Sequence, residues 1–158
     1  MNYFSNRGSA TFLLTEPRGL LYQQLIQLSR KRCATFSLVR RFGMGWSEEA
    51  AKVAAELLPF LQSEQLTKQW LGTRSSQAAQ VWRWSLTRES ALILGKTSGL
   101  FDWQQPRLPE DLTFYTPDGR VWMCSCGHEG LAEWGSADIA AQVRRTPIER
   151  NSASTFNF

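Results

Sequence analysis

The sequence predicts an α+β domain with a mainly antiparallel sheet of about five strands and two main helices packed on one face. Three observations predict it: strict alternation of apolar and polar residues at 80–86, a proline–aspartate–glycine turn at 117–119 between two apolar runs, and helical periodicity after capping residues. A parallel α/β arrangement stays open because early strands and helices alternate. The hairpin in the second half favours the antiparallel sheet.

The first third of the chain predicts two helices with a strand between them. Residues 15–17, a threonine, a glutamate and a proline, are typical of a helix start, and an apolar stripe continues to about Ser29. Residues 35–39 alternate and predict a strand. Ser47 is typical of an N-cap, and the apolar face after it continues to Pro59, where the helix ends or bends.

The middle of the chain is less regular. Residues 62–78 are polar and mixed, with a short strand or turn at 70–73. The alternating segment 80–86 follows and predicts a strand with two tryptophans on one face. A threonine at 87 then precedes a short helix expected over about 88–96.

The clearest hairpin lies in the last third. Residues 112–115 and 121–126 predict its two strands, because the proline of the connecting turn presets φ and the glycine accepts positive φ. A helix is expected over about 137–144. We expect one domain over 10–145, with flexible termini at 1–9 and 146–158.

Composition narrows the class of protein. The 158 residues contain no run of 18 apolar residues, which argues against a membrane helix, and the first residues lack the pattern of a secretory signal. Three cysteines are too few for a disulfide framework. We therefore expect a cytoplasmic protein.

Aromatic residues and arginines carry the first functional hypothesis. The chain has seven tryptophans, and tryptophan and arginine are the residue types that dominate binding energy at protein interfaces. The hypothesis is a non-catalytic module that binds another protein, such as a toxin or an effector. Its candidate anchors are Arg40, Arg41, Trp46, Trp70 and Trp103.

Charge is distributed unevenly and supports an alternative. Residues 1–45 hold seven basic residues and one acid, whereas the rest of the chain holds eleven basic and thirteen acidic residues. A basic segment attracts phosphate backbone, so nucleic acid is the second candidate partner, with Arg30, Lys31 and Arg32 as its contacts. The chain has no known nucleic-acid-binding motif.

A cysteine–histidine segment supports a second alternative, a metal- or histidine-dependent enzyme. Cys124, Cys126 and His128 alternate at the end of a predicted strand, and Cys33 would complete a set of four zinc ligands. The two cysteines are separated by one residue, whereas structural zinc sites commonly have gaps of two or more. The chain also lacks the motifs of known enzyme classes, so we expect no catalytic residue and no cofactor.

Several segments together resemble small uncharacterised bacterial proteins with no assigned activity, over about residues 20–134. The segments that carry the resemblance are 33–40, 108–115, 117–119, Trp122 and 127–129. The resemblance implies a bacterial origin and a compact α+β domain, and it transfers no catalytic residue. Small proteins of this kind include immunity proteins that neutralise a toxin, which fits the protein-binding hypothesis.

Overall fold

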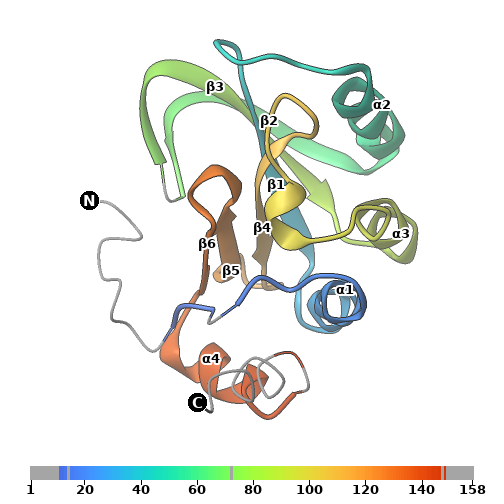
Figure 1. Ribbon diagram of the computed structural model, residues 1–158, viewed down its shortest axis with the longest axis vertical. Coiled ribbons are helices and arrows are strands. Elements are labelled where there is room, and N and C mark those ends of the chain that lie inside the picture. The colour runs from blue at the N-terminus through green and yellow to red at the C-terminus, as the bar shows by residue number, and fades with distance from the viewer. Residues whose placement is uncertain (1–10, 14, 72, 147, 149–158) are drawn as a thin grey trace.

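A single six-stranded sheet organises the chain, and every pair of neighbouring strands in it is antiparallel (Figure 1). The computed structural model describes residues 11–13, 15–71, 73–146 and 148. The α+β prediction is confirmed, with one strand more than expected, and the parallel alternative is wrong. In the order β2-β3-β1-β4-β5-β6, the strands are β1 (Thr35–Arg41), β2 (Leu61–Trp70), β3 (Thr73–Ser85), β4 (Glu110–Tyr115), β5 (Val121–Cys126) and β6 (Leu131–Trp134).

Helices cover one face of this sheet. Three of them, α1, α2 and α3, lie side by side against it, and α4 lies at the end nearest β6 (Figure 1). Their apolar residues and the inward residues of the strands form one core, which includes Tyr22, Phe36 and Trp84. The helices are α1 (Leu20–Arg32), α2 (Glu48–Leu57), α3 (Arg88–Leu94) and α4 (Ala137–Val143), with short 3-10 helices η1 (Leu58–Phe60), η2 (Leu100–Asp102) and η3 (Gly127–Glu129).

The long hairpin of β2 and β3 replaces the irregular segment expected at 62–78. It was missed because most of its side chains are exposed, so no alternation marks it as strand. In Figure 1 it curves as a long green ribbon. The tip of this hairpin reaches over to β5, where Leu71 packs against the cluster of Cys124 and Cys126.

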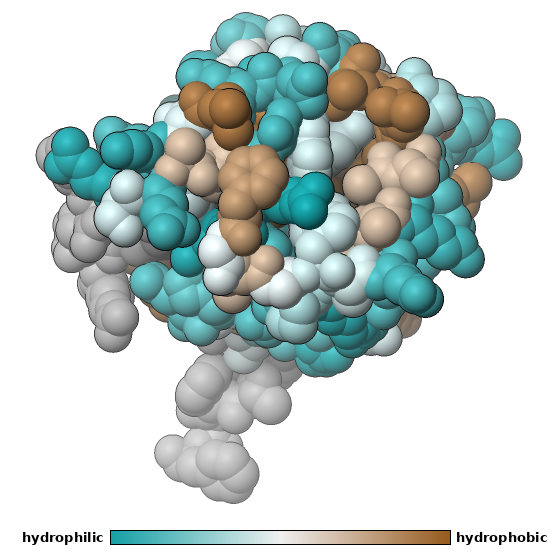
Figure 2. All heavy atoms as spheres, turned by 90° about the horizontal axis from the view of Figure 1, so that it is seen from above, coloured by the Kyte–Doolittle hydropathy of each residue, from teal (hydrophilic) through white to brown (hydrophobic). Residues whose placement is uncertain are grey.

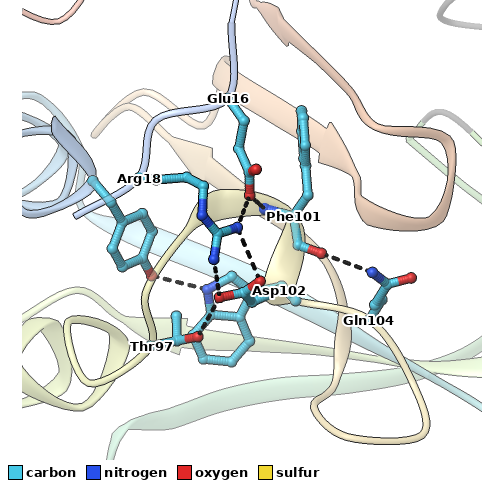
Figure 3. Close-up of polar contacts among 8 residues, drawn as sticks. Glu16, Arg18, Thr97, Phe101, Asp102 and Gln104 are labelled. Atoms are coloured by element: carbon cyan, nitrogen blue, oxygen red, sulfur yellow. Dashed lines mark hydrogen bonds and ion pairs between the residues drawn. The ribbon is translucent and has the colours of Figure 1, made fainter.

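Helix α1 begins at Leu20, five residues after the threonine that was expected to start it. Glu16 instead accepts a hydrogen bond from the backbone N–H of Phe101, and Arg18 forms ion pairs with both Glu16 (2.8 Å) and Asp102 (3.2 Å; Figure 3). These contacts hold the segment before α1 against η2, and Gly19, with φ of 56°, precedes the first residue of the helix.

The other helix starts were correctly located. Ser47, Thr87 and Ser136 each accept a hydrogen bond from a backbone N–H of the first turn of α2, α3 and α4, respectively. The four-residue strand β6, in contrast, was not expected, because its length gives little periodicity. Among the residues that the structure describes, no helix is long and apolar enough to cross a membrane.

The expected flexible termini lie mostly outside the described residues. Nothing of segment 1–9 is described, and of 146–158 only Thr146 and Ile148 are. Ile148 is buried in the main core.

Candidate functional site

Two adjacent acids, Glu110 and Asp111, are buried at the start of β4, with 0% and 2% of their surface exposed. The pairing of β4 with β1 shifts register between Ser37 and Val39, which leaves an extra residue in β4. Asp111 lies beside this bulge with φ of 60°, a left-handed conformation that is uncommon outside glycine. Bulges of this kind redirect side chains next to functional sites.

Arg41 and Trp70 surround the two acids. Arg41 Nε lies 2.9 Å from Glu110 Oε2, but the two groups do not align as a hydrogen bond, and Glu110 Oε1 has no hydrogen-bond partner within the described part of the chain. The guanidinium of Arg41 also lies 5.2 Å from the ring centroid of Trp70. Trp70 Nε1 in turn donates to Asp111 Oδ2 at 3.0 Å. The hairpin tip is thereby fixed over the acidic pair.

The two buried carboxyl groups of this pair face less positive charge than the negative charge they would carry when ionised. Burial raises the pKa of Asp111, although the hydrogen bond from Trp70 and the charge of Arg41 oppose the shift. Burial also raises the pKa of Glu110, and the negative charge of Asp111 adds to this. One guanidinium faces two buried carboxyl groups, so this site favours additional positive charge.

Cys126 and His128 lie next to Asp111. Extending the register of β4 and β5 by two residues from the pair Thr113 and Cys124 places Asp111 opposite Cys126. The turn of η3 brings His128 back toward the strand, with Nδ1 3.6 Å and Nε2 3.8 Å from Cys126 Sγ. One ligand atom each from Asp111, Cys126 and His128 lie within 4.8 Å of one another, and His128 is exposed.

This geometry does not activate Cys126 as a nucleophile. Burial raises the pKa of the Cys126 thiol to about 12, with further increases from the charges of Asp111 and Glu129. Reactive cysteines have lowered pKa values, because the thiolate is the attacking species. The donor set of thiol, imidazole and carboxylate instead suits a metal cation.

The structure brings together only part of the predicted metal set. Cys126 and His128 are neighbours, as expected. Cys33 belongs to the main core, and burial raises the pKa of its thiol to about 12, whereas Cys124 and Cys126 lie in a separate apolar cluster. Cys33 is therefore not a ligand of the same ion. Asp111 takes its place in the cluster.

Asp111 and Glu110 were missed by the sequence analysis. One signal pointed to them: adjacent residues of a strand face opposite sides, so two consecutive acids at the start of a buried strand put one carboxyl group inside. The register of the bulge, which buries both, is set by long-range pairing and leaves no local pattern.

The predicted interface anchors fall into three groups. Arg41 and Trp70 contact the acidic pair. Trp103 is 1% exposed and donates from Nε1 to the hydroxyl of Tyr22, so it is a core residue and cannot contact a partner in this fold. Arg40 and Trp46 lie at the surface.

We call Arg40, Phe42, Met44 and Trp46 the loop surface. The guanidinium of Arg40 lies 4.6 Å from the ring centroid of Trp46 and 5.4 Å from that of Phe42. Phe42 is 53% exposed and Met44 38%. Figure 2 looks onto the end of the molecule where this loop lies, and shows brown hydrophobic side chains among teal polar ones.

The basic segment Arg30, Lys31 and Arg32 lies elsewhere. It ends α1, before β1, whereas Arg40 and Arg41 end β1, and a seven-residue strand spans about 20 Å. Arg30 lines a groove of about 260 Å³ between α1 and α3, together with Arg88 and Lys96. The two groups of neighbouring basic residues, Arg30–Arg32 and Arg40–Arg41, therefore lie apart from each other.

Comparison of the chain with protein-family models, curated proteins and solved structures finds no match. The resemblance to small bacterial proteins thus stays an expectation.

Proposed function

We propose that this protein is a non-catalytic binding module that engages another protein through the loop surface. The observation that carries the proposal is the half-buried guanidinium of Arg40 over the rings of Phe42 and Trp46, beside the exposed side chain of Met44. Arginine and tryptophan at the centre of a patch, with apolar neighbours that exclude water, are the usual composition of a binding hot spot.

The loop is held in one conformation before any partner binds. Gln105 Nε2 donates to the backbone carbonyls of Arg41 and Gly45, which lie at the two ends of the loop. The backbone N–H of Ser47 donates to the carbonyl of Pro106 at 2.9 Å. A preorganised loop loses little entropy on binding, so more of the contact energy contributes to affinity.

The chemistry of the loop surface indicates the chemistry of its partner. Within the described part of the chain, Arg40 forms no ion pair, and its charge is available beside the rings. We expect a partner surface with an apolar pocket and a carboxylate at its rim. In its narrower form, the proposal is that this protein is an inhibitor of the immunity type or a cytoplasmic regulator of an effector.

The test compares variants of the loop surface with a variant at an exposed leucine elsewhere. The full chain is immobilised, and proteins retained from a bacterial lysate are quantified by mass spectrometry for wild type, Phe42→Ser, Trp46→Ala and Leu92→Ser. Leu92 is a matched control because it is 65% exposed on α3, away from the loop. A photo-crosslinker at position 44 then shows whether a retained protein contacts the loop.

We expect one protein to be crosslinked at position 44. The amount of this protein retained should fall at least tenfold with Phe42→Ser and with Trp46→Ala, but not with Leu92→Ser. Equal retention by all variants would contradict the proposal. Circular dichroism checks that each variant is folded.

Nucleic-acid binding is the alternative, and the groove with Arg30, Arg88 and Lys96 is the observation that favours it. A fluorescent single-stranded oligonucleotide titrated over a salt series distinguishes the two. If the alternative holds, binding weakens steeply with salt, and replacing Arg30, Lys31 and Arg32 by alanine reduces the slope, whereas Phe42→Ser has no effect.

A further inference from the structure

A second site lies on the opposite face of the sheet from α1–α3, where three potential ligands come from separate parts of the chain. Asp111 begins β4, Cys126 ends β5 and His128 lies in η3. Cys126 is a free thiol. The cluster is the only group of this kind found among the residues that the structure describes.

The distances fit a tetrahedral zinc ion. Zinc binds thiolate sulfur at about 2.3 Å and imidazole nitrogen at about 2.0 Å, which places the two ligand atoms about 3.5 Å apart. The Cys126 Sγ to His128 Nδ1 distance is 3.6 Å. One carboxylate oxygen of Asp111 lies within 4.8 Å of both of these ligand atoms.

The charges also fit a divalent cation. Glu110, Asp111 and a Cys126 thiolate would be three anions facing the single guanidinium of Arg41. Two negative charges remain, and a divalent cation neutralises them. Thiolate and imidazole ligands select zinc over the hard cations magnesium and calcium.

The surroundings of Asp111 are those of an oriented metal ligand. Its Oδ2 accepts from Trp70 Nε1, and its Oδ1 accepts from the backbone N–H of Gly127 at 3.3 Å. Such second contacts fix the direction of a metal-binding carboxylate. His128 is exposed, which gives the ion a path from solvent and leaves a fourth position for water.

From this geometry we propose that Asp111, Cys126 and His128 bind one zinc ion. Zinc bound here would connect β4, β5 and η3 beneath the hairpin tip. The proposal is independent of partner binding at the loop surface.

The experiment starts from the full chain stripped with a chelator and dialysed. Zinc is returned, and bound metal is measured by mass spectrometry and by competition with a chelating dye. His128→Ala is the main variant, since an exposed side chain can be removed without loss of the fold. Glu129→Gln is its matched control on the same turn, and Cys124→Ser is the control for the other cysteine of β5.

We expect one zinc per chain, at least tenfold weaker binding in His128→Ala, and affinity within twofold of wild type in both controls. Zinc should also raise the melting temperature of wild type but not of His128→Ala. Failure of wild type to bind zinc, or equal binding by His128→Ala, would overturn the proposal.

Cobalt in place of zinc tests the thiolate ligand directly. Tetrahedral cobalt with a thiolate ligand gives a sulfur-to-metal charge-transfer band, which should persist in Cys124→Ser and disappear in Cys126→Ser. The reverse pattern would show that the assigned ligand set is wrong. Asp111→Asn should weaken binding of either metal, and its folding is checked by circular dichroism.

Discussion

Replacing Arg41 by methionine removes the guanidinium that pairs with Glu110 and keeps most of the aliphatic stem. Glu110 then lies in the sheet with no ion pair, and Trp70 loses the cation over its ring. The substitution therefore measures how much of the free energy of unfolding depends on the positive charge that faces the two buried acids.

The structure sets the size of the effect. Breaking a buried ion pair by removing one partner costs about 3–5 kcal/mol, and an exposed cation–π contact adds about 0.5–1 kcal/mol. Two features reduce the loss: the side chain of Arg41 is 23% exposed, and Glu110 can take up a proton. We expect a loss of about 3 kcal/mol at pH 7, which lowers the melting temperature by about 6–12 °C.

The assay is urea unfolding of chelator-treated protein at pH 7 and pH 5. The pKa of Glu110 is raised in the folded state, so the folded protein holds more protons there than the unfolded chain, and this group lowers stability as pH rises. Loss of Arg41 raises that pKa further. The penalty of Arg41→Met should therefore be largest at pH 7 and clearly smaller at pH 5.

Arg40→Met is the matched control, because Arg40 precedes Arg41 on the same strand and contacts only exposed or half-buried rings. It should cost less than about 1 kcal/mol at both pH values. Equal losses for Arg41→Met at pH 5 and pH 7, or an Arg40→Met variant that is just as unstable, would refute the reasoning.

Two further predictions concern the same region. Burial raises the pKa of Asp111 above its ordinary 3.8, so in metal-free protein the contribution of Asp111 to stability falls as pH rises from about 4. The Asp111→Asn variant should therefore show a flatter dependence of urea unfolding on pH than wild type. An unchanged pH dependence would contradict this prediction. Gly127→Ala should lower the free energy of unfolding by about 1–3 kcal/mol in the same assay, because the added Cβ would lie 2.6 Å from the carbonyl oxygen of Trp103. Gly130→Ala is the control. Its added Cβ would meet no such atom, and only the positive φ of 61° at Gly130 would strain the alanine.

Features encoded in a few adjacent residues were predictable. The turn at 117–119 fixed the hairpin of β4 and β5, and Ser47 and Thr87 located the starts of α2 and α3, because capping and turn chemistry depend on near neighbours. The alternation at 80–86 gave the end of β3, where one face contacts the core.

Features that depend on distant pairing were not predictable. Strand β2 lies at the edge of the sheet with most side chains exposed, so its composition resembles a loop. The cluster of Asp111, Cys126 and His128 requires the bulge in β4 and the register of β4 with β5. Cys126 and His128 were recognised from sequence, but their carboxylate neighbour is fifteen residues away from Cys126 and was not.

Arg40 and Arg41 show why the two proposed sites need separate tests. Adjacent residues of a strand face opposite sides, so Arg40 contacts the rings of the loop surface while Arg41 contacts Glu110. The side-chain amide of Gln105 accepts from the backbone N–H of Arg41 at Oε1 and donates from Nε2 to the backbone carbonyls of Arg41 and Gly45. A variant that changes both arginines would remove a surface charge and destabilise the acidic pair together. Single substitutions at Phe42 and at His128, which are both exposed, change the loop surface and the metal cluster separately.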